Sequence, residues 1–198
     1  MKKVLVLGVT GLIGRQFETL LAGKAQVIGA SLNHPENPVD LSDPQSLKAL
    51  FEKVGKVDAI FCTAGVANLA PWGEAPDSEW EFGIQNKMMG QINTIRFGEQ
   101  YVNDGGVIVL TSGILAQYPF AGSGIVTTVN AAVEAAIKAS VTEIERIRIN
   151  AVSPGWVAET MVAMGMDPGP GMPAQDVAQH YVDMLDNSNS GEIVVAAK

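Results

Sequence analysis

The sequence is poor in the residues that build disulfides, metal centres and nucleic-acid surfaces. It has one cysteine, Cys62, and only two histidines, His34 and His180, which lie far apart. A single cysteine excludes an internal disulfide and fits a reducing cytoplasm, and isolated histidines give no metal-ligand spacing. Thirteen Lys and Arg against 21 Asp and Glu give a net charge of −8, which argues against a phosphate-backbone partner. We therefore expect a cytoplasmic protein with no metal and no nucleic-acid partner.

Long hydrophobic runs are also missing. No stretch approaches the roughly 20 apolar residues that span a bilayer, so no membrane partner is expected. The chain has 198 residues, of which 47% are hydrophobic and 17% charged. This length supports one domain with a sizeable core and is short for two. Residues 1–198 are therefore predicted to form a single domain.

What the chain does have is an alternation of short apolar runs with longer amphipathic ones, typical of a parallel sheet with crossover helices. Continuous apolar strands, as expected in a sheet covered on both faces, are predicted at residues 4–7, 25–30, 39, 59–62, 107–110, 147–152 and 193–195. Helices are predicted from Gly11 to about residue 22 and at residues 44–54, 78–102, 128–144 and 173–185. Asp43 caps the second, and Ser78 with Glu81 has capping-box spacing for the third. The predicted fold class is α/β, a Rossmann-like doubly wound parallel sheet of about seven strands.

A glycine-rich loop joins the first strand to the first helix. Glycines permit a tight turn and let a pyrophosphate approach the backbone, while the helix N-terminus offers N–H donors. A tight turn without a ligand is the alternative for such a string, but the strand before it and the helix after it favour dinucleotide binding. The candidate cofactor-binding residues here are Gly8, Thr10, Gly11, Leu12, Ile13 and Gly14.

The end of the second strand decides between NAD and NADP in such folds. A carboxylate there binds the 2′-hydroxyl of the adenine ribose, whereas Arg or Lys accepts a 2′-phosphate. This chain reads Ser31-Leu32-Asn33 and has neither. With no acid to repel a phosphate, NADP is favoured and NAD remains the alternative, and Ser31, Asn33 and Arg15 are candidate contacts.

Further motifs follow the later strands in order. They are Asp40-Leu41, Thr63-Ala64-Gly65, Asn86 in the long helix, Ser112 after the fifth apolar run, Pro154-Gly155 and Thr160. Together with the glycine loop, they resemble the short-chain dehydrogenase/reductase family over essentially the whole chain. The glycine spacing resembles that of the extended and atypical branches of the family.

The resemblance implies a role for each motif. Ser112 and Asn86 match the catalytic serine and asparagine. Asp40 with Leu41 matches the adenine contact, and Thr63, Ala64 and Gly65 match the segment that lines the cofactor. Pro154 and Gly155 match the segment near the nicotinamide, and Thr160 matches the threonine that contacts the carboxamide.

The pair that the family uses for proton transfer is missing. The family keeps a tyrosine and a lysine one helical turn apart on one helix face, and the lysine both holds the ribose and lowers the tyrosine pKa. At the corresponding positions this chain has Val126 and Asn130. Valine has no proton to donate, and asparagine can bond ribose hydroxyls but carries no charge.

Tyr118 is the one phenol in the loop that normally lines the substrate pocket. It is a candidate substitute proton donor, and an apolar pocket wall formed with Pro119 and Phe120 is the alternative. Lys87 neighbours Asn86, but adjacent helical positions point about 100° apart, so Lys87 is expected to face solvent or an oligomer contact.

Three functions remain open at this point. The first is an NADP(H)-dependent oxidoreductase for a small carbonyl or enone, with a non-standard proton donor. The second is a non-catalytic dinucleotide-binding protein, a pseudoenzyme or sensor. The third is a non-redox isomerase or cyclase that uses the same pocket. The resemblance also implies a homo-oligomer, either a dimer or a tetramer.

Overall fold

A parallel sheet runs through the molecule in the order β2-β1-β3-β4-β5-β6. In this computed structural model, which describes all 198 residues, the strands are β1 (Lys2–Leu7), β2 (Ala25–Ala30), β3 (Val57–Cys62), β4 (Val102–Thr111), β5 (Arg148–Pro154) and β6 (Ile193–Ala196). The chain steps outward from β1 to β2 and then returns past β1 to β3. This reversal opens a crevice at the carboxyl ends of β1 and β3, where doubly wound folds bind ligands.

The predicted α/β class and parallel sheet are confirmed, but the seventh strand is wrong. The sheet has six strands, and the short apolar run at Val39 forms only an isolated bridge between Ser31 and Pro38. Proline has no N–H for a ladder. Two residues later the chain already turns, because the Asp40 carboxylate accepts the backbone N–H of Ser42 at 2.8 Å.

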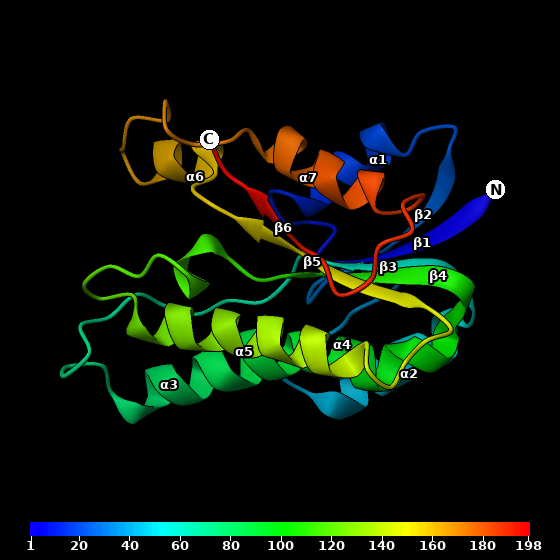
Figure 1. Cartoon of the computed structure of the whole chain (residues 1–198), viewed down its shortest axis with the longest axis horizontal. Helices are drawn as coiled ribbons and strands as arrows, with labels where there is room; N and C mark the ends of the chain where they lie inside the picture. The colour runs from blue at the N-terminus through cyan, green and yellow to red at the C-terminus, as the bar shows by residue number, and fades with distance from the viewer.

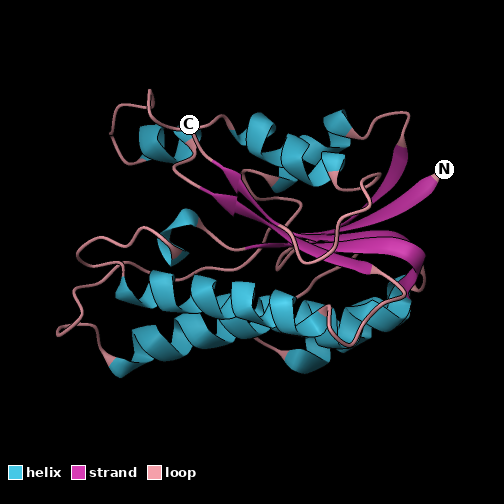
Figure 2. Ribbon diagram, in the orientation of Figure 1, coloured by secondary structure: helices cyan, strands magenta, loops and turns pink.

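Helices cover both faces of the sheet (Figures 1 and 2). On one face lie α2 (Pro44–Val54), α4 (Gly90–Gly98) and α5 (Gly124–Ser140), over a core that includes Leu7, Ile60 and Leu110. On the other face lie α1 (Phe17–Leu20) and α7 (Ala174–Asp183), over a core that includes Phe61 and Tyr181. Alternate residues of each central strand therefore enter different cores, which explains their continuous apolar runs.

The long helix predicted at residues 78–102 is continuous, but its hydrogen-bonding pattern changes along its length. It consists of α3 (Asp77–Gly83), the π-helical segment η2 (Ile84–Met89), α4 and the 3₁₀ turn η3 (Glu99–Tyr101). The predicted capping box is wrong, because the cap residue is Pro76 and no side chain caps the helix. The π segment carries Asn86 and Lys87, and such segments frequently occur at functional sites.

Other boundaries shift in ways that matter for the site. α2 begins as predicted, with Asp43 accepting the N–H of Gln45 at 2.8 Å. The first helix is shorter than predicted, a 3₁₀ turn η1 (Gly14–Gln16) followed by α1. α5 begins at Gly124 rather than residue 128, so Val126 and Asn130 both lie on it. The sequence reasoning missed the short helices η4 (Ile114–Ala116) and α6 (Ala158–Ala163), which border the crevice.

Candidate functional site

Two adjoining hollows lie along the carboxyl edge of the sheet and share Gly65. The first, the glycine-loop hollow, has a volume of about 330 Å³; of the predicted residues it is lined by Gly8, Thr10, Gly11, Ser31, Asp40, Leu41, Thr63, Ala64, Gly65 and Asn86. The second, the serine hollow, has a volume of about 410 Å³; of the predicted residues it is lined by Gly65, Ser112, Asn130, Pro154, Gly155 and Thr160. Residues from both ends of the chain thus meet in one crevice.

The glycine loop forms a cradle that side chains would fill. Gly8 has φ +92°, and a Cβ on it would lie 2.8 Å from the backbone nitrogen of Ala64. A Cβ on Gly14 would lie 2.1 Å from the carbonyl oxygen of Gly8. Two of the three glycines are therefore required by close backbone contact. Leu12, Ile13 and Gly14 lie outside the hollow lining, and Ile13 packs instead against the core beneath α1 and α7.

Polar atoms at the end of β2 include one without a partner. Ser31 is 7% exposed, and its Oγ is buried with no hydrogen-bond partner in the chain. The neighbouring Asp40 is already occupied, because one carboxylate oxygen accepts both the N–H and the hydroxyl of Ser42. The Ser31 hydroxyl is therefore the free buried polar group of the glycine-loop hollow.

Gln91 fixes the ends of β3 and β4 relative to each other. Its side chain is fully buried; Nε2 donates to the carbonyl oxygen of Ala64 at 2.6 Å, and Oε1 accepts the N–H of Thr111 at 3.1 Å. These bonds hold the Thr63–Gly65 segment of one hollow against the start of the Ser112 loop in the other. The arrangement makes the shared wall of the two hollows rigid.

The π segment presents two neighbouring side chains to the shared wall. Asn86 Oδ1 accepts the N–H of Val66 at 2.7 Å. Lys87 is only 8% exposed, and a Cβ on Gly65 would lie 3.0 Å from its Cδ. The expectation that Lys87 faces solvent is therefore wrong. Burial lowers the pKa of Lys87 to about 8, and no carboxylate pairs with it.

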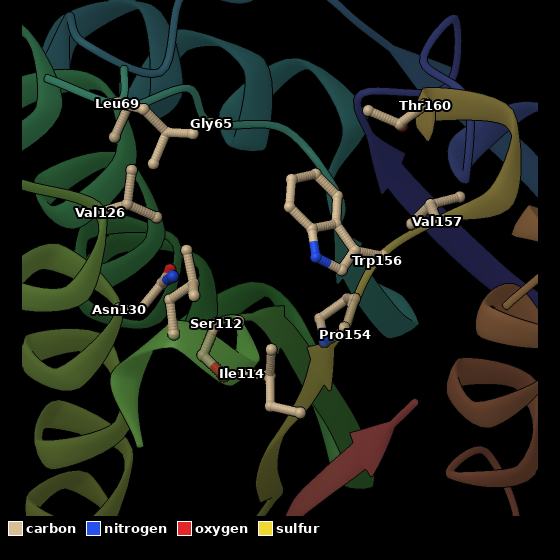
Figure 3. A pocket seen from close by; sticks show the side chains of 14 residues that line it. Gly65, Leu69, Ser112, Ile114, Val126, Asn130, Pro154, Trp156, Val157 and Thr160 are labelled. Carbon is tan, nitrogen blue, oxygen red and sulfur yellow. The ribbon is translucent and has the colours of Figure 1, made fainter. Parts of the chain in front are cut away.

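One face of α5 lines the serine hollow beside Ser112 (Figure 3). Val126 and Asn130 are one turn apart on this face and both line the hollow. Asn130 is 3% exposed, and its Oδ1 is buried with no hydrogen-bond partner. The Ser112 hydroxyl donates to Oε1 of Glu134, one further turn along α5, at 3.0 Å. Sequence reasoning missed Glu134, although its spacing from Asn130 places both on one helix face.

The opposite wall of the serine hollow comes from the segment after β5. Pro154, Gly155 and Thr160 line it, together with Trp156, which the sequence reasoning did not select. Figure 3 shows the Trp156 indole extending from this segment across from Ser112 and Asn130. The wall is largely apolar, so the hollow suits a small molecule with an apolar body.

Three aromatic residues lie outside both hollow linings. Tyr118 is 67% exposed on the loop between β4 and α5. Trp72 and Trp80 contact each other edge-on with ring centroids 5.3 Å apart. A Cβ on Gly124 would lie 2.2 Å from the Trp72 ring. The tryptophan pair therefore packs the loop before α3 against the start of α5.

The side chains form no metal-binding cluster of three or more His, Cys, Asp or Glu residues. None of the helices combines the length and apolar character that crossing a membrane requires. Cys62 is buried, and burial raises the pKa of its thiol to about 11, so it is unreactive as a thiolate.

The fold and crevice define a doubly wound α/β protein with a glycine-loop site, and comparisons with known proteins specify the family. Residues 11–194 match the family model described as enoyl-(acyl carrier protein) reductase. A curated relative, short-chain dehydrogenase/reductase ATR9 of Stachybotrys chlorohalonatus, is 26% identical over 79% of this chain and 72% of its own length. The chain belongs to the short-chain dehydrogenase/reductase family of oxidoreductases, as the motifs predicted.

Solved structures support the same assignment. The protein lin1944 from Listeria innocua is 32% identical, with a TM-score of 0.93 over 98% of this chain and 99% of that one. A small-chain dehydrogenase is 29% identical, with a TM-score of 0.87 over 98% and 95% of the two chains. A small-chain dehydrogenase in complex with NADPH is 28% identical, with a TM-score of 0.87 over 98% and 96%.

Proposed function

We propose that this protein is an NADP(H)-dependent oxidoreductase that acts on a small carbonyl or enone with a non-standard proton donor. The observation that carries the proposal is that two of the three buried, unpartnered side-chain oxygens belong to hollow-lining residues, Ser31 Oγ in one hollow and Asn130 Oδ1 in the other; the third, Ser153 Oγ, belongs to neither lining. A buried polar atom without a partner costs about 1–3 kcal/mol. One extended ligand with hydroxyl or phosphate groups at both ends, as in a dinucleotide, would give each oxygen a partner.

The residues of the crevice fit such a ligand along its length. We assign the pyrophosphate to the glycine loop of Gly8, Thr10, Gly11 and Gly14, with Leu12 and Ile13 supporting it through the backbone. The adenine end falls to Ser31, Asp40 and Leu41, and the middle to Thr63, Ala64 and Gly65. The nicotinamide end falls to Asn130, Pro154, Gly155 and Thr160. Residues 1–198 are thus one dinucleotide-binding domain.

The phosphorylated cofactor is favoured over NAD by the charges at the end of β2. Ser31, Leu32 and Asn33 supply no carboxylate there. Arg15 is held beside the glycine loop, where Nε donates to the Gly11 carbonyl and an Nη to the Thr10 carbonyl. Its remaining N–H groups are available to a 2′-phosphate. The NADPH complex of a similar solved structure supports this choice.

When bound, the nicotinamide supplies or accepts a hydride, and the chain positions the substrate and moves the proton. Val126 and Asn130 occupy the places of the family's tyrosine and lysine, so neither a phenol nor a cation stands beside the reacting oxygen. Ser112 and Asn86 are the proposed catalytic side chains that remain in the crevice. Tyr118 would have to swing in from an exposed loop to act as donor.

A non-catalytic dinucleotide-binding protein is the second candidate. The observation that favours it is the serine hollow itself, whose lining contains no tyrosine and no lysine. In that case the same NADPH contacts serve a sensor or subunit. For either candidate we propose a homo-oligomer, dimer or tetramer, located in the cytoplasm.

Titration of NADPH fluorescence tests the proposal, followed by turnover against aldehydes, ketones and enones. We expect NADPH to bind more tightly than NADH and at least one carbonyl compound to be reduced. Arg15→Gln should lower the affinity for NADPH but not for NADH, with the exposed Lys138→Gln as control. Binding without turnover of any compound would support the second candidate. Failure of both nicotinamide dinucleotides to bind would refute both.

A further inference from the structure

We propose that Glu134 acts through Ser112, so that the two form a relay that exchanges a proton with the substrate oxygen in the serine hollow. The proposal rests on the proposed function, because it supplies that reaction with the proton route the family's tyrosine would otherwise provide. Ser112 is the catalytic residue, which touches the substrate. Glu134 is the positioning residue behind it.

Both residues of the pair are buried, and Ser112 lines the serine hollow. Ser112 is 5% exposed and Glu134 7% exposed. The backbone of Ser112 is fixed to β5, because its N–H donates to the Val152 carbonyl at 3.0 Å. Its hydroxyl donates to Glu134 Oε1 at 3.0 Å, and Ser112 also lines the hollow. The serine therefore connects a buried carboxyl group to the substrate space.

The stability of the fold does not explain why the Glu134 carboxyl group is buried here. The bond from Ser112 is the single hydrogen bond that the Glu134 carboxylate accepts, and no cation pairs with it. A buried charge with so little compensation destabilises a fold. Glutamate is also unnecessary for packing α5, whose other buried residues are apolar apart from Asn130 in the serine hollow; Val129, Val133 and Ile137 are fully buried. A role in proton transfer accounts for its presence.

The protonation state of Glu134 decides what Ser112 offers the substrate. A serine hydroxyl has one proton and two lone pairs. While Glu134 is ionised it accepts that proton, and Ser112 presents only lone pairs to the hollow. When Glu134 is protonated, its O–H donates to Ser112 Oγ and the serine O–H is free to turn toward the hollow. Ser112 is thus a proton acceptor in one state and a proton donor in the other.

The resulting step balances in both directions. In reduction, the carbonyl carbon accepts a hydride from the reduced nicotinamide, and the C=O π pair moves to oxygen. The Ser112 O–H bond breaks as the alcohol O–H forms, and the Glu134 proton passes to Ser112 Oγ. Glu134 is left as a carboxylate and regains a proton from solvent through the Ser112 hydroxyl once the product has left the hollow. In oxidation the same proton moves from the alcohol through Ser112 to ionised Glu134.

Other ionisable groups on the elements that pack against α5 are few near this pair. Lys87 on η2 is the buried ionisable residue among them. The ionisable residues on α3 are Asp77, Glu79 and Glu81, and the one on α4 is Arg96. Arg148 on β5 bonds the carbonyls of Met184 and Leu185. On α5 itself the other ionisable group is the exposed Lys138, one turn beyond Glu134. A titration lost on removal of Glu134 but kept without Lys87 therefore belongs to the relay.

The test compares pH profiles of kcat/KM for carbonyl reduction and alcohol oxidation in the wild type, Glu134→Gln, Ser112→Ala and the double variant. In the wild type we expect reduction to fall and oxidation to rise with pH about a common midpoint. Glu134→Gln keeps the shape of the side chain and should remove that pH dependence and lower kcat about 100-fold. The double variant should be no slower than Ser112→Ala, because the residues act as one unit. Glu143→Gln, on the exposed turn after α5, and Lys87→Met should keep the wild-type pH dependence.

A second readout is independent of turnover. Infrared spectra of the protein without substrate should contain a protonated-carboxyl C=O band that disappears with rising pH and is missing in Glu134→Gln. NADPH affinity should stay within about twofold of wild type in Glu134→Gln, which separates the relay from cofactor binding. If the wild type turns over but Glu134→Gln has the same profile and rate, the relay is refuted and the proposed function stands. If the wild type fails to bind NADPH or to turn over, the proposed function fails and the relay fails with it.

Discussion

The two hollows share one wall but are built in different ways. The glycine-loop hollow depends on the backbone, since its form follows from the close contacts of Gly8 with Ala64 and of Gly14 with Gly8. The serine hollow depends on side chains, mainly Ser112, Asn130 and Trp156, with Glu134 bonded to Ser112 outside the lining. A backbone cradle tolerates few substitutions, whereas side chains can be exchanged on an unchanged helix. This difference fits the proposal that the chain keeps the family's cofactor cradle and moves the proton with other residues.

The largest expected effect is at the backbone cradle. In Gly14→Ala the new Cβ would lie 2.1 Å from the Gly8 carbonyl oxygen, so the loop must open. We expect a loss of about 1–3 kcal/mol of stability together with loss of NADPH binding. Urea denaturation and NADPH fluorescence measure the two effects. Gly73→Ala is the control, because nothing lies within 4 Å of that position. A Gly14→Ala protein with wild-type affinity would contradict the backbone origin of this hollow.

The next effect concerns the shared wall, where Lys87 is buried without an anionic partner. A pKa lowered from 10.5 to about 8 corresponds to a cost of about 3 kcal/mol for the charged form. The cost is fully present below pH 8, where the folded protein must hold the proton, and is relieved as pH rises toward 10.5. Lys87→Met should therefore raise the free energy of unfolding at pH 7 by about 2–3 kcal/mol.

Denaturation of both proteins between pH 7 and pH 10 checks this prediction. The difference between the two curves should shrink as pH rises. Burial raises the pKa values of Cys62 and Tyr181, which lowers stability at alkaline pH. The Tyr181 contribution cancels in the difference, whereas that of Cys62 does not cancel fully, because the Lys87 charge lowers the Cys62 pKa. A difference that stays constant with pH would mean that Lys87 keeps its proton in the folded protein up to pH 10, so that burial does not lower its pKa.

Sequence patterns predicted the backbone-built parts well because those parts are local. The strands read as apolar runs, and the glycine loop lies between a strand and a helix, so both could be read from neighbouring residues. Asp43 likewise caps α2 as predicted. The seventh strand failed because an apolar residue, Val39, is buried without joining a ladder.

The parts built from side chains were less predictable because they depend on the rotation of each residue about its helix axis and on partners that are distant in the sequence. Lys87 was placed in solvent or at an oligomer contact by assuming ideal α-helical rotation, but in the π segment both Asn86 and Lys87 contact the Gly65–Val66 wall. In the sequence Glu134 looks like an ordinary glutamate of a helix. Its proposed role depends on the hydrogen bond from Ser112, which lies 22 residues earlier in the chain. Helical spacing from Val126 and Asn130 was the available signal.

A smaller effect compares the unpartnered oxygens of the two hollows directly. Removing the Asn130 amide or the Ser31 hydroxyl takes away about one hydrogen bond to the proposed cofactor, worth about 1 kcal/mol or roughly fivefold in affinity. We therefore expect Asn130→Ala and Ser31→Ala each to weaken NADPH binding about fivefold, and the double variant to combine both losses. Fluorescence titration measures each. Wild-type affinity in one variant would show that the ligand does not reach that hollow.

The smallest expected effect is at Tyr118, the phenol that sequence reasoning offered as a substitute donor. Its side chain is 67% exposed and lies outside the lining of the serine hollow. If Ser112 and Glu134 carry the proton, Tyr118→Phe should leave kcat and its pH profile within about twofold of wild type. The same assay on Ser112→Ala provides the contrast. A loss of orders of magnitude in Tyr118→Phe would instead mean that the loop between β4 and α5 closes over the substrate and that the proton comes from the phenol.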